Sequence, residues 1–242
     1  MKPVWIFVHH PVEGPGRLAE FFAQQQIPYQ LIPVWDGAHI PSNLSETSGL
    51  VFMGGPMSVH DSLPWIALEL DLIRRAHAQN IPILGHCLGA QLITLALGGT
   101  VFRGSAQEIG WLPIELHPQS ASRAWFGDST HTTVFHWHGE QCSLPAGATR
   151  LASTAITENQ AFALGNTLAM QFHLEMEADM VKRWCTIHRQ ELDEALQSLE
   201  NQASVQKREV MLAQTDAALS KLNPLAHQVY AHWTSLLQPA YH

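Results

Sequence analysis

Short runs of apolar residues alternate with amphipathic segments along the first hundred residues of the chain. Each run is bounded by glycine, proline or polar residues, which is typical of a buried strand. The segments between the runs carry apolar residues three or four positions apart, as a helix packed on a sheet does. The predicted strands are Val4–Val8, Tyr29–Val34, Gly49–Met53 and Ile81–Leu84, and the predicted helices are Leu18–Gln25, Ile66–His77 and Leu88–Leu97.

The pattern changes after Thr100, where short extended segments separated by turns replace the alternation. A hairpin is predicted around Gly165-Asn166, because this pair favours a tight turn between two apolar strands. From Glu175 onward the pattern is helical, with one long helix over 180–199 and a last helix that begins at Asn223-Pro224. The short strands predicted in this half are Val101-Phe102, Gly110–Leu116, Thr132–Phe135 and Ala148–Ala155.

Together these patterns predict an α/β fold of three layers, in which a largely parallel, twisted sheet carries helices on both faces. We divide the chain into a main domain, residues 1–195, and a C-terminal helical extension, residues 196–242. An apolar stripe in the extension, from Leu225 to Leu236, favours packing on the main domain. The alternative is a docking surface for a partner or for a second copy of the chain in a homodimer.

The junction between the strand ending at Leu84 and the next helix carries Gly85-His86-Cys87-Leu88-Gly89. Glycines two positions before and after a central nucleophile are the spacing of a nucleophile elbow, here with cysteine in place of serine. Such a turn imposes strained backbone angles on its central residue and leaves no room for flanking side chains. It also places the Cys87 thiol at a helix N-terminus, where the helix dipole favours a thiolate.

Composition narrows the classes of partner. Charged residues make up only 14% of the chain and its formal net charge is −8, which argues against nucleic-acid or anionic-membrane binding. The N-terminal apolar run is too short for a signal peptide, and no window approaches a membrane span. The three cysteines, Cys87, Cys142 and Cys185, are widely spaced and suggest no disulfide framework. We therefore expect a reducing, cytoplasmic location, which suits a catalytic thiol.

Histidine is abundant, with 15 residues, but most occur singly and none falls in an HExxH spacing. His136 and His138 are two positions apart and have no evident third metal ligand. Packing at the end of a strand is therefore an alternative to a binding role for these histidines. We expect neither a metal nor a cofactor.

His173 and Glu175 follow directly on the second strand of the predicted hairpin. Residues two apart on an extended segment point the same way, so Glu175 could orient the His173 ring as a general base. An ordinary His and Glu on an exposed turn is the alternative.

Three separate segments resemble class I glutamine amidotransferases. The string Gly85-His86-Cys87-Leu88-Gly89-Ala90-Gln91 resembles their nucleophile motif, and His173-Leu174-Glu175 resembles their later His-x-Glu, with Leu174 where proline is usual. The segment Gln107–Trp111 is similar to that of stand-alone members related to the glutaminase domain of GMP synthase. The resemblance covers roughly residues 4–190 and implies a catalytic triad of Cys87, His173 and Glu175.

The resemblance also implies roles around the nucleophile. By that match, Gly54-Gly55-Pro56 is the oxyanion strand, and the N–H groups of Gly55 and Leu88 form the oxyanion hole. It likewise implies that Gln91 and the segment Trp137-His138-Gly139 bind the substrate. Trp137 and the following Glu140 depart from the usual motif, and Trp137 could reshape the pocket.

The implied reaction is hydrolysis of the glutamine side-chain amide through a γ-glutamyl thioester, with release of ammonia. The sequence contains no S-G-G-x-D-S phosphate loop, so we expect the ammonia to serve a separate synthetase subunit if it is used at all. Two alternatives stay open: a γ-glutamyl hydrolase acting on another amine conjugate, and a non-catalytic regulatory protein on the same fold.

Overall fold

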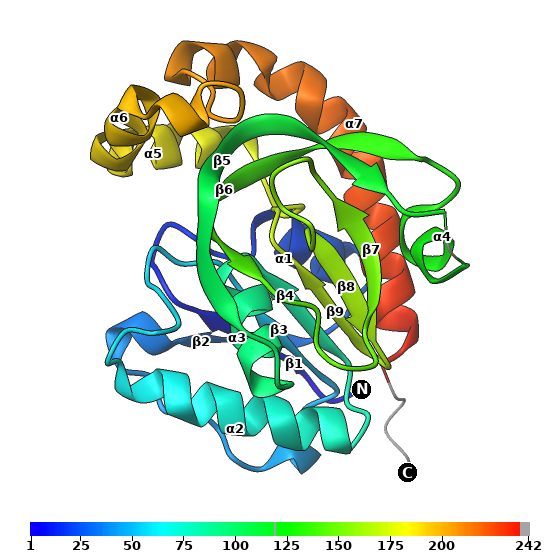
Figure 1. The fold of residues 1–242 in the computed structure, drawn as a ribbon. Helices are drawn as coiled ribbons and strands as arrows, with labels where there is room; N and C mark the ends of the chain where they lie inside the picture. The colour runs from blue at the N-terminus through cyan, green and yellow to red at the C-terminus, as the bar shows by residue number, and fades with distance from the viewer. Residues whose placement is uncertain (119, 238–242) are drawn as a thin grey trace.

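A single sheet runs through the molecule, and the computed structural model describes residues 1–118 and 120–237 of the chain (Figure 1). Within these residues the sheet has nine strands in the order β2-β1-β3-β4-β9-β8-β7-β5-β6. The strands are β1 Val4–Val8, β2 Tyr29–Pro33, β3 Gly49–Phe52, β4 Ile83–His86, β5 Val101–Leu116, β6 His131–Cys142, β7 Thr149–Ser153, β8 Ala161–Leu164 and β9 Thr167–Met170.

Five of these strands, β2, β1, β3, β4 and β9, run parallel, which confirms the predicted α/β architecture. The other four, β8, β7, β5 and β6, join antiparallel, so the complete sheet is mixed. Because parallel strands end at the same edge of a sheet, the residues that follow β3, β4 and β9 lie close together. This edge carries Gly54, Cys87 and His173.

Helices cover both faces of the sheet, as predicted. Alternate residues of β1 enter two different cores: Val4, Ile6 and Val8 pack with α1, α5 and α7, whereas Trp5 and Phe7 pack with α2 and α3. This alternation is the period of two expected of a strand buried on both sides. The helices are α1 Gly16–Gln24, α2 Pro64–Ala78, α3 Leu88–Ala96, α4 Ser120–Phe126, α5 Ala178–Ile187, α6 Arg189–Gln197 and α7 Arg208–Ser235, with 3₁₀ turns at Val34–Asp36, Leu44–Glu46 and Leu199–Asn201.

Strands β5 and β6 are longer than the sequence pattern predicts. The two short segments Val101-Phe102 and Gly110–Leu116 belong to one strand, which has a register shift between Arg103 and Glu108. Both strands continue past glycine and polar positions that interrupt the apolar pattern, because β5 and β6 pair with each other there. As a consequence, Trp137, His138 and Gly139 lie within β6 rather than after it.

The helical half also differs from the prediction. The single long helix over 180–199 is divided into α5 and α6 at His188, whose ψ of 26° leaves the α-helical range. In contrast, the helix predicted to begin at Asn223-Pro224 begins at Arg208, and Pro224 lies inside α7. Buried residues on both sides of Pro224, such as Leu222 and Trp233, enter the same core, and this packing outweighs the intrinsic helix-breaking tendency of proline.

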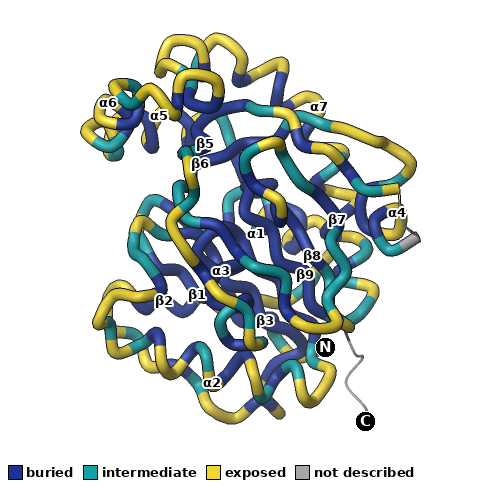
Figure 2. The backbone as a smooth tube through the Cα atoms, in the orientation of Figure 1, coloured by how far each residue is buried: buried dark blue, intermediate teal, exposed yellow. Residues whose placement is uncertain are grey.

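Helix α7 crosses the sheet and is buried along one side (Figures 1 and 2). It contacts α1, α4 and α5 as well as β5 and β6. Its apolar side chains thus share a core with the strands, and the domain boundary at residue 195 stays a prediction. Among the described residues, no helix combines the length and the apolar character needed to cross a membrane.

Candidate active site

Cys87 lies between the last residue of β4 and the first of α3, with a φ of 50° and a ψ of −107°. These angles are strained for a residue with a side chain, as a nucleophile elbow requires. The flanking glycines are needed for space. A Cβ on Gly89 would lie 2.0 Å from the carbonyl oxygen of Phe52, and one on Gly85 would lie 2.7 Å from the backbone carbon of Gly89.

Cys87 is 7% exposed, and it lines a cavity. Its Sγ donates a weak hydrogen bond to the carbonyl oxygen of Trp137, at 3.7 Å. The Cys87 backbone N–H donates to Met170 of β9, and the Gly89 N–H donates to Met53 after β3. The turn is thereby fixed to both neighbouring strands, and the thiol is presented at the N-terminus of α3.

His173 and Glu175 are brought together behind this thiol. The Nδ1 atom of His173 lies 2.6 Å from Glu175 Oε1, and both side chains are buried. The His173 Nε2 atom has no hydrogen-bond partner among the described residues. The His173 backbone N–H donates to Phe135 of β6, which anchors the segment after β9.

Burial alone would lower the pKa of His173, but the Glu175 carboxylate and then the Cys87 side chain outweigh it, so this pKa is held well above its usual value. Burial would raise the pKa of Glu175, but the neighbouring His86 and His173 rings bring it down to about 2. The second oxygen of Glu175 lies 3.2 Å from His86 Nδ1. Glu175 therefore stands between two imidazoles as a carboxylate at neutral pH.

Gly54 lies between Cys87 and His173. A Cβ at Gly54 would lie 3.0 Å from His173 Cε1 and 3.7 Å from Cys87 Cβ, so a larger residue would separate the two. The next residue, Gly55, adjoins Leu88, because its Cβ would lie 2.8 Å from Leu88 Cδ2. Leu88 begins α3, and its N–H has no acceptor within the helix.

A cavity of about 290 Å³ opens in front of Cys87. Every residue predicted to bind substrate reaches its wall, as does Gly55, whereas His173 and Glu175 lie behind it. The residues along the wall are Glu13, Gly55, Pro56, Met57, Ser58, Cys87, Gln91, Arg103, Gln107, Trp137, His138, Gly139, Glu140, Trp184, His188 and Glu191.

The β6 segment at this wall is held by a buried polar network. Glu108 accepts hydrogen bonds from Thr157 and Gln160, at 2.6 and 2.7 Å, and lies 3.5 Å from His138. Glu108 lies close enough to His136 and His138 for the three side chains to bind a metal ion together. The sequence had shown no third ligand for this pair of histidines. Since Glu108 already accepts two hydrogen bonds, the network serves to fix the position of β6 beside Cys87.

Sequence reasoning did not find several residues at the site. His86 adjoins Cys87 in the chain, yet only the folded structure brings its ring to Glu175. Glu13, Trp184 and His188 reach the cavity from the loop after β1 and from the α5 region. Glu13 follows two histidines and a proline in a loop, and nothing in that local pattern indicates a site.

Comparison with known proteins identifies the family of the chain. The model of the family "Glutamine amidotransferase class-I" matches residues 18–182, and the chain belongs to that family. It is 31% identical over 204 residues to the glutamine amidotransferase-like protein YfeJ of Salmonella typhimurium, covering 79% of this chain and 83% of that protein.

Solved structures extend the likeness over the whole chain. A glutamine amidotransferase from Methylobacillus flagellatus superposes with a TM-score of 0.96 at 37% identity, covering 100% of this chain and 98% of that one. A glutamine amidotransferase from Thermotoga maritima gives a TM-score of 0.84 at 26% identity, covering 98% of this chain and 99% of that one.

A longer relative matches only part of the chain. GMP synthase of Porphyromonas gingivalis is 34% identical over 57% of this chain, and the matched residues are only 26% of that enzyme.

Proposed function

We propose that the protein hydrolyses the side-chain amide of glutamine with Cys87 as nucleophile, His173 as acid and base, and Glu175 as the group that orients His173. The observation that carries this proposal is the convergence of the Cys87 elbow and the His173–Glu175 pair at Gly54. A strained, glycine-flanked thiol beside an ion-paired imidazole is the arrangement that thiolate catalysis needs.

In the first half-reaction the Cys87 thiol gives its proton to His173 Nε2, and the thiolate attacks the amide carbon. The N–H groups of Gly55 and Leu88 stabilise the negative charge that develops on the carbonyl oxygen. His173 then returns the proton to the amide nitrogen, ammonia departs, and a γ-glutamyl thioester remains on Cys87. Glu175 stabilises the imidazolium that exists between the two transfers.

In the second half-reaction His173 takes a proton from water, and the resulting hydroxide attacks the thioester carbon. The C–S bond breaks, the thiolate recovers a proton through His173, and glutamate leaves. Gln91 and the segment Trp137-His138-Gly139 hold the α-amino and α-carboxyl groups of the substrate during both halves. Their place on the cavity wall beside Cys87 supports this role.

We also propose that the ammonia serves an acceptor on a separate synthetase subunit, because the GMP synthase related to this chain is a glutamine-hydrolysing enzyme about twice its length. A cytoplasmic location suits the reduced thiol, and neither a metal nor a cofactor takes part in the proposed steps.

Release of glutamate from glutamine tests the proposal directly. Substituting Cys87→Ser or His173→Ala should lower kcat by about a thousandfold or more, because both residues act in the bond-breaking steps. Cys185→Ser, which changes a buried cysteine of α5, should retain the activity of the unmodified protein. Undiminished glutamate release by Cys87→Ser would refute the proposal.

A further inference from the structure

One wall of the cavity carries side chains that the proposed mechanism does not use. Glu13 and Glu191 place carboxylates there, and Trp184 and His188 place aromatic rings. Glu13 is only 6% exposed. Among the described residues, its carboxylate makes no hydrogen bond, and its ion-pair contact is His188 Nε2, at 3.6 Å. The Glu13 carboxylate lines the cavity and accepts no hydrogen bond from the described residues, so a ligand in the cavity that carries donors can bind to it.

Glu13 lies near the His173 ring, which protonates the leaving amine in the proposed mechanism. A Cβ on Gly54 would lie 2.8 Å from Glu13 Oε2 and 3.0 Å from His173 Cε1, so the carboxylate adjoins the ring that protonates that amine. Trp184 contacts both the segment that carries Glu13 and the His173 ring. Its Nε1 donates to Val12, next to Glu13, at 3.0 Å, and its ring meets the His173 ring edge-on with centroids 4.8 Å apart.

Aromatic rings surround the same space. The Trp137 ring lies 6.1 Å from that of Trp184 and 5.7 Å from that of His188. Glu191 accepts a hydrogen bond from Trp137 Nε1 at 3.0 Å, which brings a second carboxylate to this wall. Indole faces and carboxylates are the groups that recognise an alkylammonium ion.

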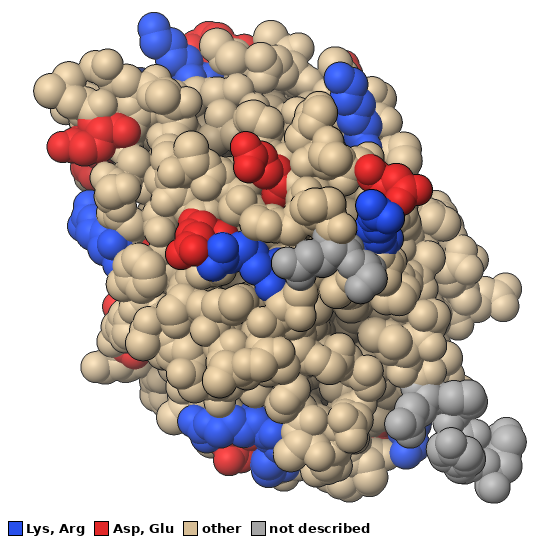
Figure 3. Space-filling model, turned by 45° about the vertical axis from the view of Figure 1, so that its right-hand side comes forward, with Lys and Arg blue, Asp and Glu red and all other residues tan. Residues whose placement is uncertain are grey.

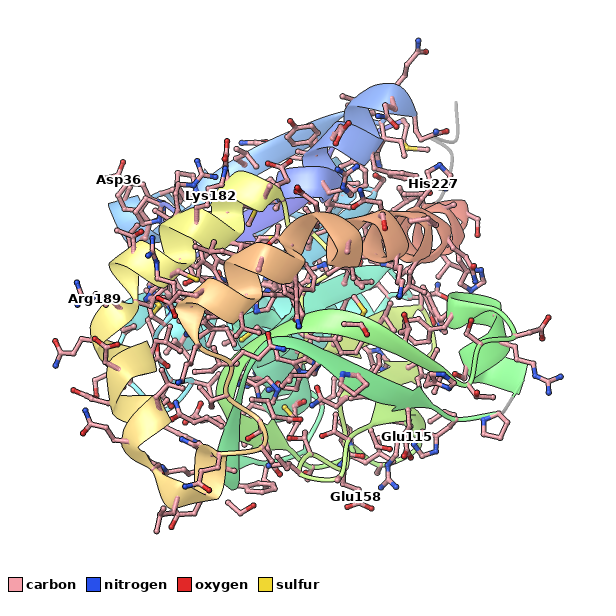
Figure 4. All side chains as sticks on the ribbon, turned by 90° about the horizontal axis from the view of Figure 1, so that it is seen from above. Asp36, Glu115, Glu158, Lys182, Arg189 and His227 are labelled. Carbon is pink, nitrogen blue, oxygen red and sulfur yellow. The ribbon has the colours of Figure 1, made fainter. Side chains whose placement is uncertain are left out.

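The charges of the cavity point to the same class of ligand. Glu13, Glu140 and Glu191 face it with a single guanidinium, that of Arg103. Two cations of α5 and α6 are held outside: Lys182 pairs with Asp179 and Arg189 with Asp193, and both are well exposed (Figure 4). A glutamine zwitterion adds no net charge, so the carboxylates near the leaving group would stay uncompensated.

We propose that Glu13, with Trp184, His188 and Glu191, forms a subsite for a cationic leaving amine, so that among substituted γ-glutamyl amides those of diamines are hydrolysed in preference to those of neutral or anionic amines. In such a substrate the amide nitrogen carries a short alkyl chain that ends in an ammonium group. The inference rests on the proposed Cys87 chemistry. Attack at the γ-carbonyl breaks the same C–N bond, His173 protonates the departing diamine, and water releases glutamate from the thioester.

Three γ-glutamyl amides of matched length test the subsite. They are the amide of 1,4-diaminobutane, which is cationic, that of n-pentylamine, its neutral isostere, and that of 4-aminobutyrate, which is anionic. We expect kcat/KM to be at least about tenfold higher for the cationic amide than for the neutral one, and lowest for the anionic one. Glu13→Gln should reduce the ratio of cationic to neutral kcat/KM severalfold. The matched control Glu20→Gln, on the exposed side of α1, should keep that ratio.

Equal kcat/KM for the cationic and neutral amides, with glutamine hydrolysed normally, would overturn the subsite and leave the proposed function standing. Absence of turnover for every γ-glutamyl compound would instead overturn the proposed function. Calorimetric binding of the three amides to the Cys87→Ala variant would then decide the subsite. His10, Glu13 and His188 also place potential metal ligands within 4.8 Å of one another. A charge preference that EDTA abolishes and Zn²⁺ restores would therefore assign these residues to a metal and contradict the proposal.

Discussion

Cys87, Cys142 and Cys185 are all buried, yet their surroundings give them different chemistry. Burial raises the pKa of Cys142 to about 12 and also raises that of Cys185. Cys87 alone combines an elbow, a helix N-terminus and a neighbouring imidazole. We therefore propose that Cys87 is the reactive cysteine because of its position, since only a thiolate is an effective nucleophile.

We predict that a glutamine-like electrophile, such as a γ-chloroketone analogue, labels Cys87 and leaves Cys142 and Cys185 unmodified. Peptide mass spectrometry after brief treatment would locate the label, and Cys142→Ser should label as fast as the unmodified protein. Labelling of Cys142 at the rate of Cys87 would show that the elbow confers no special reactivity.

A second prediction at this scale concerns Glu175, whose pKa falls from 4.5 to about 2 on folding. A carboxyl with a depressed pKa stabilises the fold above its unfolded pKa, and this contribution is lost as the pH falls through the folded value. We expect Glu175→Gln to lower the free energy of unfolding by about 3 kcal/mol near neutral pH, and the difference to shrink below about pH 4.5. Urea unfolding of both proteins across this range measures it. A difference in the free energy of unfolding that stays constant with pH would contradict the lowered pKa of Glu175.

Local spacing predicts a reactive Cys87 from its flanking glycines, but not what surrounds it. The assignment of His173 and Glu175 rests on the resemblance to class I glutamine amidotransferases, because a His and a Glu two positions apart are common on ordinary turns. Glu13 and His86 reach the site only through long-range contacts, with His188 and Glu175 respectively. No local pattern encodes such contacts.

Among the elements, the strand–helix junction after β4 is tightly constrained by backbone contacts. Strand β3 passes so close to α3 that the carbonyl of Phe52 occupies the space of any side chain at Gly89. The same contact aligns the end of β3, and hence Gly54 and Gly55, with Cys87.

We predict that Gly89→Ala destabilises the protein by more than about 3 kcal/mol, because the added methyl group must displace backbone rather than a side chain. Gly14→Ala, in a loop with nothing within 4 Å of the new Cβ, is the matched control and should change stability little. Denaturant unfolding compares the two. Similar stabilities for both variants would mean that β3 and α3 are not held as tightly as described.

The strands and helices of the first hundred residues follow from apolar periodicity, because each is a short element bounded by strong turn signals. The periodicity fails where packing overrides local preference. Helix α7 continues through Pro224 since its buried side chains lie on both sides of that residue, and β5 continues through a register shift because β6 pairs with it. The helix α4 gave no signal recognised in the sequence.

At the scale of the whole molecule, the C-terminal helix is part of the structure that supports the site. Tyr230 of α7 is fully buried and its ring meets that of His86, the partner of Glu175, with centroids 6.2 Å apart. Charged residues are sparse and both signs are interspersed on the face shown in Figure 3, so no basic patch gathers on its described residues. We propose that residues 196–237 pack on the domain formed by residues 1–195 as one cooperative unit; the last five residues of the predicted extension, 238–242, lie outside the described residues.

We predict that Trp233→Ala, which removes a fully buried side chain of α7, lowers stability by about 3–5 kcal/mol. Its unfolding should stay a single transition, with circular dichroism and Cys87 accessibility changing together. The control is Val210→Ala, on an exposed position of the same helix. Loss of helical signal before Cys87 becomes accessible would show that the C-terminal segment unfolds separately.

Hydroxylamine trapping shows whether Cys87 carries a γ-glutamyl thioester during turnover, as we propose. Hydroxylamine attacks a thioester faster than water does, so incubation with glutamine should yield γ-glutamyl hydroxamate. We expect the unmodified protein to form this product at a rate that rises with hydroxylamine concentration, and Cys87→Ala to form none above background. Hydroxamate formation by Cys87→Ala at the rate of the unmodified protein would show that the thioester does not form on Cys87.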